Sequence, residues 1–163
     1  MNAPDRFLLA DVQASADQRQ LAIHKVGVKG LRYPLAVLDA GGKAQHTVAQ
    51  VTMSVGLPPE VKGTRMSRFV EILEQRRAPL NIDRLRHMFE DMLSRLDAGS
   101  GEIELAFPYF IRKAAPVSTV ESLLDYDVRM IIGKRAGQAA ETTLEIVAPV
   151  TSLSPCTKER SDH

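Results

Sequence analysis

The sequence predicts an α+β fold in which an antiparallel β-sheet carries two helices inserted between strand pairs. Five segments alternate apolar and polar residues, which is the period of a half-buried strand. Two segments between the second and third of these have the three-and-four spacing of amphipathic helices. Strands and helices do not alternate one by one along the chain, so the sheet is expected to be antiparallel rather than parallel.

The composition is that of an ordinary globular domain. Of 163 residues, 44% are hydrophobic and 25% are charged. Lys and Arg total 21 against 20 for Asp and Glu, which excludes a strongly basic nucleic-acid binder. The chain has a single cysteine, Cys156, and neither a secretory signal pattern nor an apolar run long enough to span a bilayer. We therefore expect a cytoplasmic protein that contacts neither nucleic acid nor membrane.

The first third of the chain predicts an arm and two strands. Residues 1–30 lack a sustained period and are expected to form an irregular arm that ends in VGVKG at 26–30. The first strand is expected over 31–38, at a sheet edge because it contains Pro34. Gly41-Gly42 predicts a hairpin turn. The second strand ends at Pro58-Pro59, and its apolar face consists of Ala49, Val51, Met53, Val55 and Leu57.

Two helices follow. Ser67 is predicted to cap the first, and Ala78-Pro79 to end it. Its apolar side is expected to consist of Phe69, Val70 and Leu73. Asn81 is predicted to cap the second helix and Gly99 to follow its C-terminus. The apolar stripe of that helix is expected to consist of Ile82, Leu85, Met88, Phe89, Met92, Leu93 and Leu96. His87 lies off the stripe and is interpreted as a solvated residue rather than a ligand.

Strand periodicity then returns in three segments, at 102–109, 126–132 and 143–150. The last two are expected to form a hairpin across the polar, glycine-bearing residues 133–140. Pro108 and Pro116 bracket 109–115, and we expect them to end strand pairing there. The folded domain is therefore assigned to residues 31–150, after the arm at 1–30.

Two segments have residue types suited to chemistry. In KGTRMSRF at 62–69, Lys62, Arg65 and Arg68 stand before or within the first helical turn, where cations oppose the helix dipole. A bound anion such as phosphate would account for them, and a solvated basic loop is the alternative. Cys156 follows the last strand with Lys158 nearby, and a cation favours the thiolate form. An incidental thiol is the alternative there.

Several motifs, taken in chain order, resemble those of the type IB GTP cyclohydrolases. They are DVQAS at 11–15, KVGVKGLRYP at 25–34, KGTRMSRF at 62–69, APVS at 115–118, SLLDYDV at 122–128 and PVTSLSPCTKE at 149–159. The resemblance implies a tunnelling fold, in which sheets of several subunits join edge to edge into a barrel, and hence a homo-oligomer. It also implies hydrolysis of GTP to 7,8-dihydroneopterin triphosphate and formate, the first step of tetrahydrofolate synthesis. A divalent metal (zinc, manganese or iron) activates the water in such a reaction.

The chain departs from the family pattern at the metal site. Ser154 occupies the position of the first cysteine of the usual Cys-Pro-Cys, which serves catalysis, and Cys156 matches the second. Arg65 replaces a usual histidine. The family also continues into a second half that supplies further ligands, so residues 151–163 are interpreted as a truncated metal-site loop. We expect the free 163-residue chain to lack activity, and the alternative function is an inactive fragment that binds a partner or a nucleotide.

GTP carries a triphosphate, which basic side chains would have to bind. The basic residues available to a triphosphate are Lys62, Arg65, Arg68, Lys113 and Lys158. The nitrile reductase of queuosine synthesis shares the tunnelling fold and uses a cysteine. Its Glu-Ser-Leu-Lys signature is not met here, because Leu124 follows Glu121-Ser122-Leu123. The sequence therefore favours the cyclohydrolase.

Overall fold

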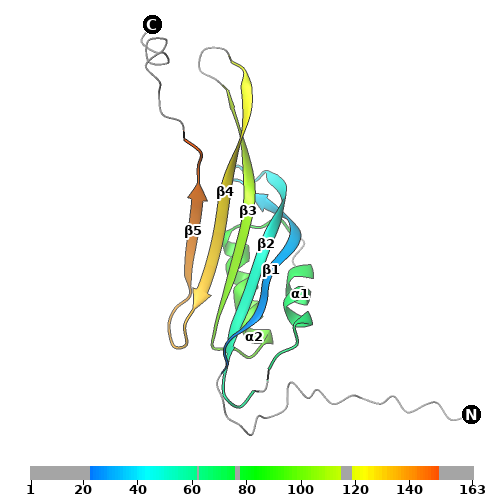
Figure 1. Cartoon of the computed structure of the whole chain (residues 1–163), viewed down its shortest axis with the longest axis vertical. Helices are drawn as coiled ribbons and strands as arrows, with labels where there is room; N and C mark the ends of the chain where they lie inside the picture. The colour runs from blue at the N-terminus through cyan, green and yellow to red at the C-terminus, as the bar shows by residue number, and fades with distance from the viewer. Residues whose placement is uncertain (1–22, 62, 76–77, 115–118, 151–163) are drawn as a thin grey trace, which may run out of the picture.

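The structure, a computed structural model, describes residues 23–61, 63–75, 78–114 and 119–150. Five strands form one antiparallel sheet in the order β1-β2-β3-β4-β5, and two helices lie against one of its faces (Figure 1). The elements are β1 Ile23–Leu38, β2 Ala44–Leu57, α1 Ser67–Glu74, α2 Ile82–Arg95, β3 Ser100–Ala114, β4 Glu121–Lys134 and β5 Glu141–Val147. The predicted α+β class, element order and antiparallel pairing are confirmed.

Strand β1 begins earlier than the sequence pattern indicates. It starts at Ile23, so residues 23–30, which were expected to belong to the arm, are part of the sheet. Its pairing with β2 shifts register between Ile23 and Val26 and again between Val28 and Leu31. Gly30 has φ +67°, a left-handed conformation that suits glycine. The glycines therefore belong to a bulged edge strand, and bulges interrupt the period on which the prediction relied.

The core lies between the sheet and the helices. The predicted apolar face of β2 is confirmed, since its five residues are all buried. The matching faces of β3 and β4 contribute further buried residues: Ile103, Leu105, Phe107, Val128, Met130 and Ile132. The other face of the sheet has no helix over it among the described residues (Figure 1). The sheet is therefore apolar toward the helices and polar on its open face.

Helix α1 differs from its prediction in two respects. Ser67 is its first residue rather than its cap, and Met66 occupies the cap position without a side-chain hydrogen bond. Val70 is 39% exposed, whereas Ile72 is fully buried beside Phe69 and Leu73. The apolar face is thus rotated from the expected one, because the side of the helix that carries Ile72 faces the core.

Helix α2 follows its prediction at the N-terminus and departs from it at the C-terminus. The Asn81 side chain accepts a hydrogen bond from the Arg84 backbone N–H at 2.9 Å, which confirms the cap. The left-handed residue after the helix is Asp97, with φ +48°, and not Gly99. The Ala98 N–H donates to the Leu93 carbonyl at 2.9 Å, as in a Schellman motif. Ile82 is exposed, unlike the rest of the predicted stripe, and His87 is exposed as expected.

Pro108 does not end the pairing of β3 with β4, contrary to the prediction. That pairing continues to Ala114 opposite Glu121, whereas pairing of β2 with β3 stops at Gln50 opposite Ala106. The Pro108 carbonyl accepts from the Thr47 hydroxyl on β2 at 2.9 Å. Because the N–H and C=O of a strand residue face the same neighbour, the donor that Pro108 lacks is on the β2 side. Only the β2 ladder is therefore interrupted.

Beyond this point β3 and β4 project as a two-stranded arm, residues 109–114 and 121–126 (Figure 1). At its base the Gln45 side chain replaces the missing ladder: its amide donates to the Phe110 carbonyl at 2.9 Å and its oxygen accepts from the Phe110 N–H at 2.7 Å. At the other end of β4 the predicted hairpin to β5 is confirmed. Strand β5 ends at Val147 rather than at 150.

Candidate functional site

The basic loop before α1 contains the described residues of the KGTRMSRF motif. Thr64 is buried, Arg65 is exposed and Arg68 is half-buried. The Arg68 N–H donates to the Arg65 carbonyl at 3.1 Å, and the Phe69 N–H donates to the Met66 carbonyl at 3.2 Å. These bonds span three residues, so the helix begins with a tight turn that holds both arginines at its N-terminal end. A helix N-terminus and two guanidinium groups are together suited to a phosphate.

Thr64 has an unpaired hydroxyl. The residue is 8% exposed, and among the described residues its side-chain oxygen has no hydrogen-bond partner. A buried polar atom without a partner destabilises a fold by about 1–3 kcal/mol. The loop therefore contains a group whose removal should benefit stability. Nothing in the sequence pattern marks Thr64, because its burial is a property of the folded chain.

Thr64→Val is therefore expected to raise the free energy of unfolding by about 1 kcal/mol, since valine keeps the shape and removes the unpaired hydroxyl. Urea denaturation followed by circular dichroism measures the change. Thr64→Ser serves as the control, because it keeps the hydroxyl and loses a buried methyl group, and it should destabilise the protein. If valine and serine destabilise it equally, the hydroxyl has a partner that stabilises the native state.

The other predicted phosphate ligands lie elsewhere. Lys113 is on the β3–β4 arm, thirteen residues along β3 from Ser100, which pairs with Gly56 near the end of β2. At a rise of about 3.3 Å per residue that is roughly 40 Å, and the basic loop follows the end of β2. Within one chain the structure therefore does not bring Lys113 to Arg65 and Arg68. The remaining predicted site residues lie outside the described residues: Lys62, Ser154, Cys156 and Lys158.

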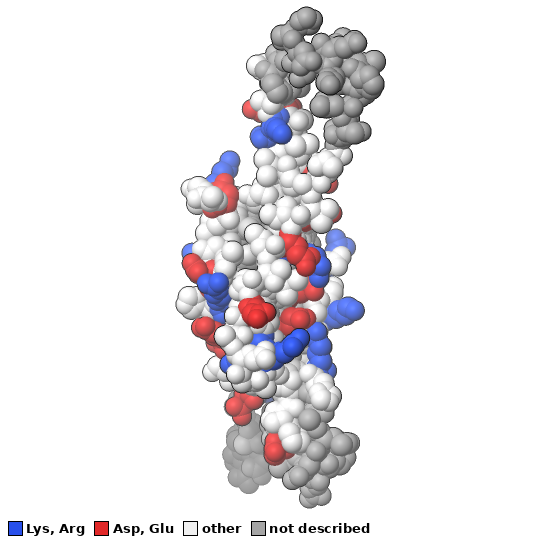
Figure 2. All heavy atoms as spheres, turned by 90° about the vertical axis from the view of Figure 1, so that its left-hand side faces the viewer, with Lys and Arg blue, Asp and Glu red and all other residues white. Residues whose placement is uncertain are grey.

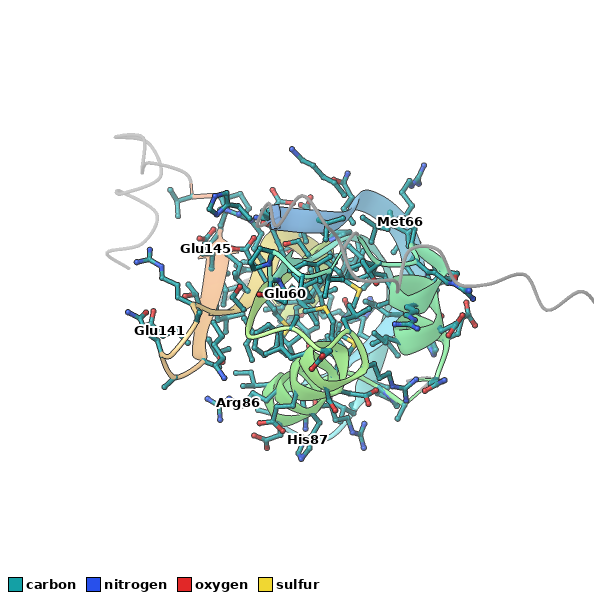
Figure 3. The ribbon with its side chains drawn as sticks, turned by 90° about the horizontal axis from the view of Figure 1, so that it is seen from below. Glu60, Met66, Arg86, His87, Glu141 and Glu145 are labelled. Carbon is teal, nitrogen blue, oxygen red and sulfur yellow. The ribbon has the colours of Figure 1, made fainter. Side chains whose placement is uncertain are left out.

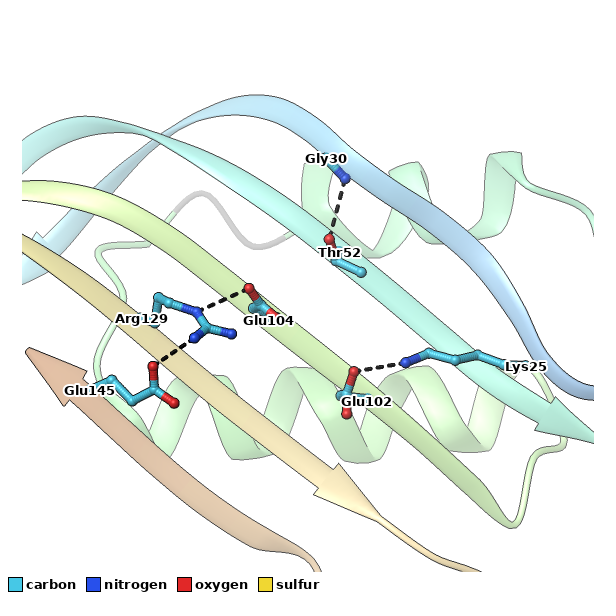
Figure 4. Close-up of polar contacts among 7 residues, drawn as sticks. All are labelled: Lys25, Gly30, Thr52, Glu102, Glu104, Arg129 and Glu145. Carbon is cyan, nitrogen blue, oxygen red and sulfur yellow. Dashed lines mark hydrogen bonds and ion pairs between the residues drawn. The ribbon is translucent and has the colours of Figure 1, made fainter.

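The open face of the sheet carries ion pairs that sequence reasoning missed (Figure 4). Arg129 on β4 contacts Glu104 on β3 at 3.2 Å and Glu145 on β5 at 2.6 Å, and Lys25 on β1 contacts Glu102 on β3 at 2.9 Å. These residues stand at polar positions of alternating strands, but only the register between strands shows which of them meet. The contacts connect strands from β1 to β5 across the polar face.

The hydrogen bond that Arg129 donates to Glu104, and then the charges of Glu104 and Glu145, raise the pKa of Arg129 above its ordinary value. A raised pKa keeps the guanidinium charged at every pH at which the protein is handled. The stabilisation that this charge provides is lost only as the pH rises through the guanidinium range. The charges of Arg129, Glu104 and Glu145 therefore balance within the network, and we interpret this network as structural.

The basic loop and the ion-pair network lie on different sides of the fold. Seen from below, Met66 lies by α1, whereas Glu145 and Glu141 lie on β5 at the opposite side (Figure 3). On the side that carries β5, acidic and basic side chains are interspersed over the surface (Figure 2). Of the charged features in the part of the chain that the structure describes, the basic loop is the best candidate for an anionic substrate.

A metal site is not formed by the described residues. Within 23–61, 63–75, 78–114 and 119–150, no three side chains of His, Cys, Asp or Glu are grouped to hold an ion. The loop that the sequence suggests for a metal, with Ser154 and Cys156, lies outside these ranges. We therefore derive no catalytic step through a metal ion. In the same part of the chain, no helix is long and apolar enough to cross a membrane.

Comparison with known proteins decides the family. A family model described as type I GTP cyclohydrolase FolE2 matches residues 9–163. The chain belongs to the FolE2 family. This confirms the resemblance carried by the motifs, several of which lie in the described sheet and basic loop. The FolE2 match includes residues 151–163 as well as the folded domain.

Individual FolE2 proteins are similar over the same region. "GTP cyclohydrolase FolE2 1" of Dechloromonas aromatica is 64% identical over 163 residues, which is 100% of this chain and 61% of that protein. "GTP cyclohydrolase FolE2" of Nitrosococcus oceani is 52% identical over 155 residues, 95% of this chain and 58% of that protein. That of Azoarcus sp. is 48% identical over 163 residues. The chain thus spans about three fifths of the length of these relatives.

Proposed function

We propose that this chain takes part in the hydrolysis of GTP to 7,8-dihydroneopterin triphosphate and formate. The observation that carries the proposal is the FolE2 match over residues 9–163, together with 64% identity to a GTP cyclohydrolase over the full length of the chain. Opening of the guanine ring needs water at its C8 and binding of the negatively charged triphosphate. The described residues offer candidates for triphosphate binding.

The basic loop is the proposed triphosphate contact. Arg65 and Arg68 lie at the start of α1, where guanidinium groups can bind phosphate oxygens in pairs and the helix N-terminus adds partial positive charge. Lys62 precedes them in the same motif and is proposed as a third contact. Lys113 is proposed to reach the same triphosphate only from another copy of the chain, because it is remote within one copy. Lys158 is proposed as a further contact.

Formate release from GTP tests the function. The chain is assayed with zinc or manganese, alone and together with the part of the Dechloromonas relative that it does not cover. Formate and 7,8-dihydroneopterin triphosphate in either assay support the proposal. GTP binding in equilibrium dialysis without formate in either assay would favour the second candidate, a nucleotide-binding fragment. If GTP is neither bound nor hydrolysed, both are wrong.

The metal-site loop is proposed to bind a divalent cation through Cys156, a thiolate ligand that suits zinc, with Ser154 at the neighbouring position. When bound, such an ion supplies hydroxide from water near neutral pH. Serine is a poor zinc ligand. The chain's own sequence therefore predicts a weakened site that a single substitution can strengthen.

Ser154→Cys is accordingly expected to raise zinc affinity at least about tenfold, because a second thiolate joins Cys156. Competition with a chromogenic zinc chelator measures the affinity without reference to catalysis. Ser154→Ala is the matched control and should leave zinc affinity close to that of the unaltered chain. Equal zinc affinity of the cysteine and alanine variants would contradict the proposed role of this loop.

A tunnelling fold built from several copies is proposed from the two sheet edges. The β1 edge is protected by bulges and by Pro34. The Leu38 N–H also donates to the Leu80 carbonyl there. Strand β5 has no described partner on its outer side and contains neither proline nor lysine. Leu144 and Ile146 face the helix side yet are 49% and 58% exposed. An open, apolar edge of this kind favours pairing with another strand.

Self-association should depend on the outward backbone donor of Leu144. The Gln45 contacts place the Phe110 backbone toward β2, and alternation across the registers then turns the Leu144 N–H away from β4. Leu144→Pro removes that donor and keeps the pairing with β4, so light scattering should show a smaller assembly. Leu144→Val keeps the donor and should assemble normally. Identical assemblies in the two variants would rule out pairing through this edge.

A further inference from the structure

A cavity of about 360 Å³ lies on the helix side of the sheet, between the β1–β2 hairpin and α2. Its floor consists of buried or half-buried apolar side chains, among them Leu35, Met88 and Leu105. Two exposed residues, His46 and Arg84, line it as well. The volume falls at the lower end of the range for small-molecule pockets, about 300–1,000 Å³. The cavity is thus apolar inside, and the exposed Arg84 supplies a cationic side chain at its edge.

Backbone hydrogen bonds hold the wall of this cavity in place. Leu80, which lines the cavity, donates from its N–H to the Ala36 carbonyl at 2.7 Å and accepts from the Leu38 N–H at 2.8 Å. The Asn81 cap follows directly and fixes the start of α2. Because the chain before α2 is bonded to β1 in this way, the wall is positioned without a ligand. A preorganised cavity binds small molecules at a lower entropic cost.

The charges around the cavity favour one class of ligand. None of the described lining residues is acidic, whereas Arg84 carries a permanent positive charge. Its guanidinium donates to the Pro79 carbonyl, and a guanidinium has five N–H donors in all. Donors therefore remain to bind a carboxylate at the mouth in the geometry that arginine prefers. An apolar body would fill the floor below.

We propose that this cavity binds a small apolar monocarboxylate, with its hydrocarbon part against Leu35, Met88 and Leu105 and its carboxylate on Arg84. Among the described residues, none of the basic loop lines the cavity. The proposal therefore goes beyond the GTP cyclohydrolase function and does not depend on it. Its test needs neither GTP nor metal.

Octanoate titration into the chain, followed by methyl NMR, tests the proposal. Octanoate should shift the Met88 methyl resonance in a saturable manner. Arg84→Gln should weaken octanoate binding about fivefold to tenfold, as expected for loss of a charge-assisted bond near solvent. Arg86→Gln is the matched control, since Arg86 is on the same helix, donates to the Thr142 hydroxyl on β5 at 3.4 Å and does not line the cavity.

1-Octanol separates the two halves of the proposed site. It should shift the same Met88 resonance, and its affinity should be equal in Arg84→Gln and in the unaltered chain, because it has no carboxylate. The proposal is overturned if octanoate leaves Met88 unshifted up to its solubility limit. It is also overturned if the Arg84 and Arg86 variants bind octanoate equally well.

Discussion

Gly27→Ala is expected to destabilise the fold by about 3 kcal/mol or more. A Cβ atom at this position would meet the backbone of β2, with the Met53 carbonyl oxygen nearest and the Ser54 Cα at 2.6 Å. Real Cβ atoms do not approach other atoms so closely, and a backbone cannot rotate aside as a flexible side chain can. Met53 is fully buried and belongs to the middle of the core. Strand β1 must therefore separate from β2 to admit the methyl group.

Urea denaturation compares this variant with Gly99→Ala. A Cβ at Gly99 would have no heavy atom within 4 Å, and Gly99 does not have a positive φ, so its replacement should change stability little. The expected result is that the urea concentration at the unfolding midpoint falls strongly for Gly27→Ala and stays nearly unchanged for Gly99→Ala. If the two variants unfold at the same urea concentration, the close approach of β1 to β2 is not a feature of the folded protein.

Periodicity in the sequence was sufficient for most of the sheet and insufficient where the ladder is irregular. The alternation at 49–57 predicts the buried face of β2, because a strand buried on one side must alternate. The same criterion fails at Gly27 and Gly30, where register shifts interrupt the alternation. At Pro108 the expectation that a proline ends strand pairing was too strict. Whether a proline breaks a pairing depends on which neighbour its nitrogen faces, and that is a property of the assembled sheet.

The candidate site shows the same limit. The place of Arg65 and Arg68 at the start of a helix predicts that they act together, and the structure keeps them together because only two residues separate them. Charge alone groups Lys113 with them, and the register of β3 places it on a distant arm. The contact of Arg129 with Glu104 and Glu145 joins three strands that the sequence separates widely. Local chemistry can be predicted from local sequence, whereas contacts between strands require the register.

Phe69→Ala is expected to cost about 3–5 kcal/mol and to release α1 from the sheet. The helix has only eight residues and no side-chain cap, so it is too short to persist in water without tertiary contacts. Those contacts come from Phe69, Ile72 and Leu73, which are all buried. Phe69 is the largest of the three, and its removal leaves a cavity that so short a helix has little means to close.

Val70→Ala is the matched control, because Val70 is the neighbouring residue on α1, is 39% exposed and should change stability by less than about 0.5 kcal/mol. Hydrogen exchange measures α1 directly: its amides should lose protection in Phe69→Ala and retain it in Val70→Ala. Since Arg68 belongs to the same helix, GTP binding should weaken only in the Phe69 variant. Protected α1 amides in Phe69→Ala would show that contacts other than this side chain hold the helix. GTP binding that persists after α1 has lost protection would remove the basic loop from the proposed triphosphate site.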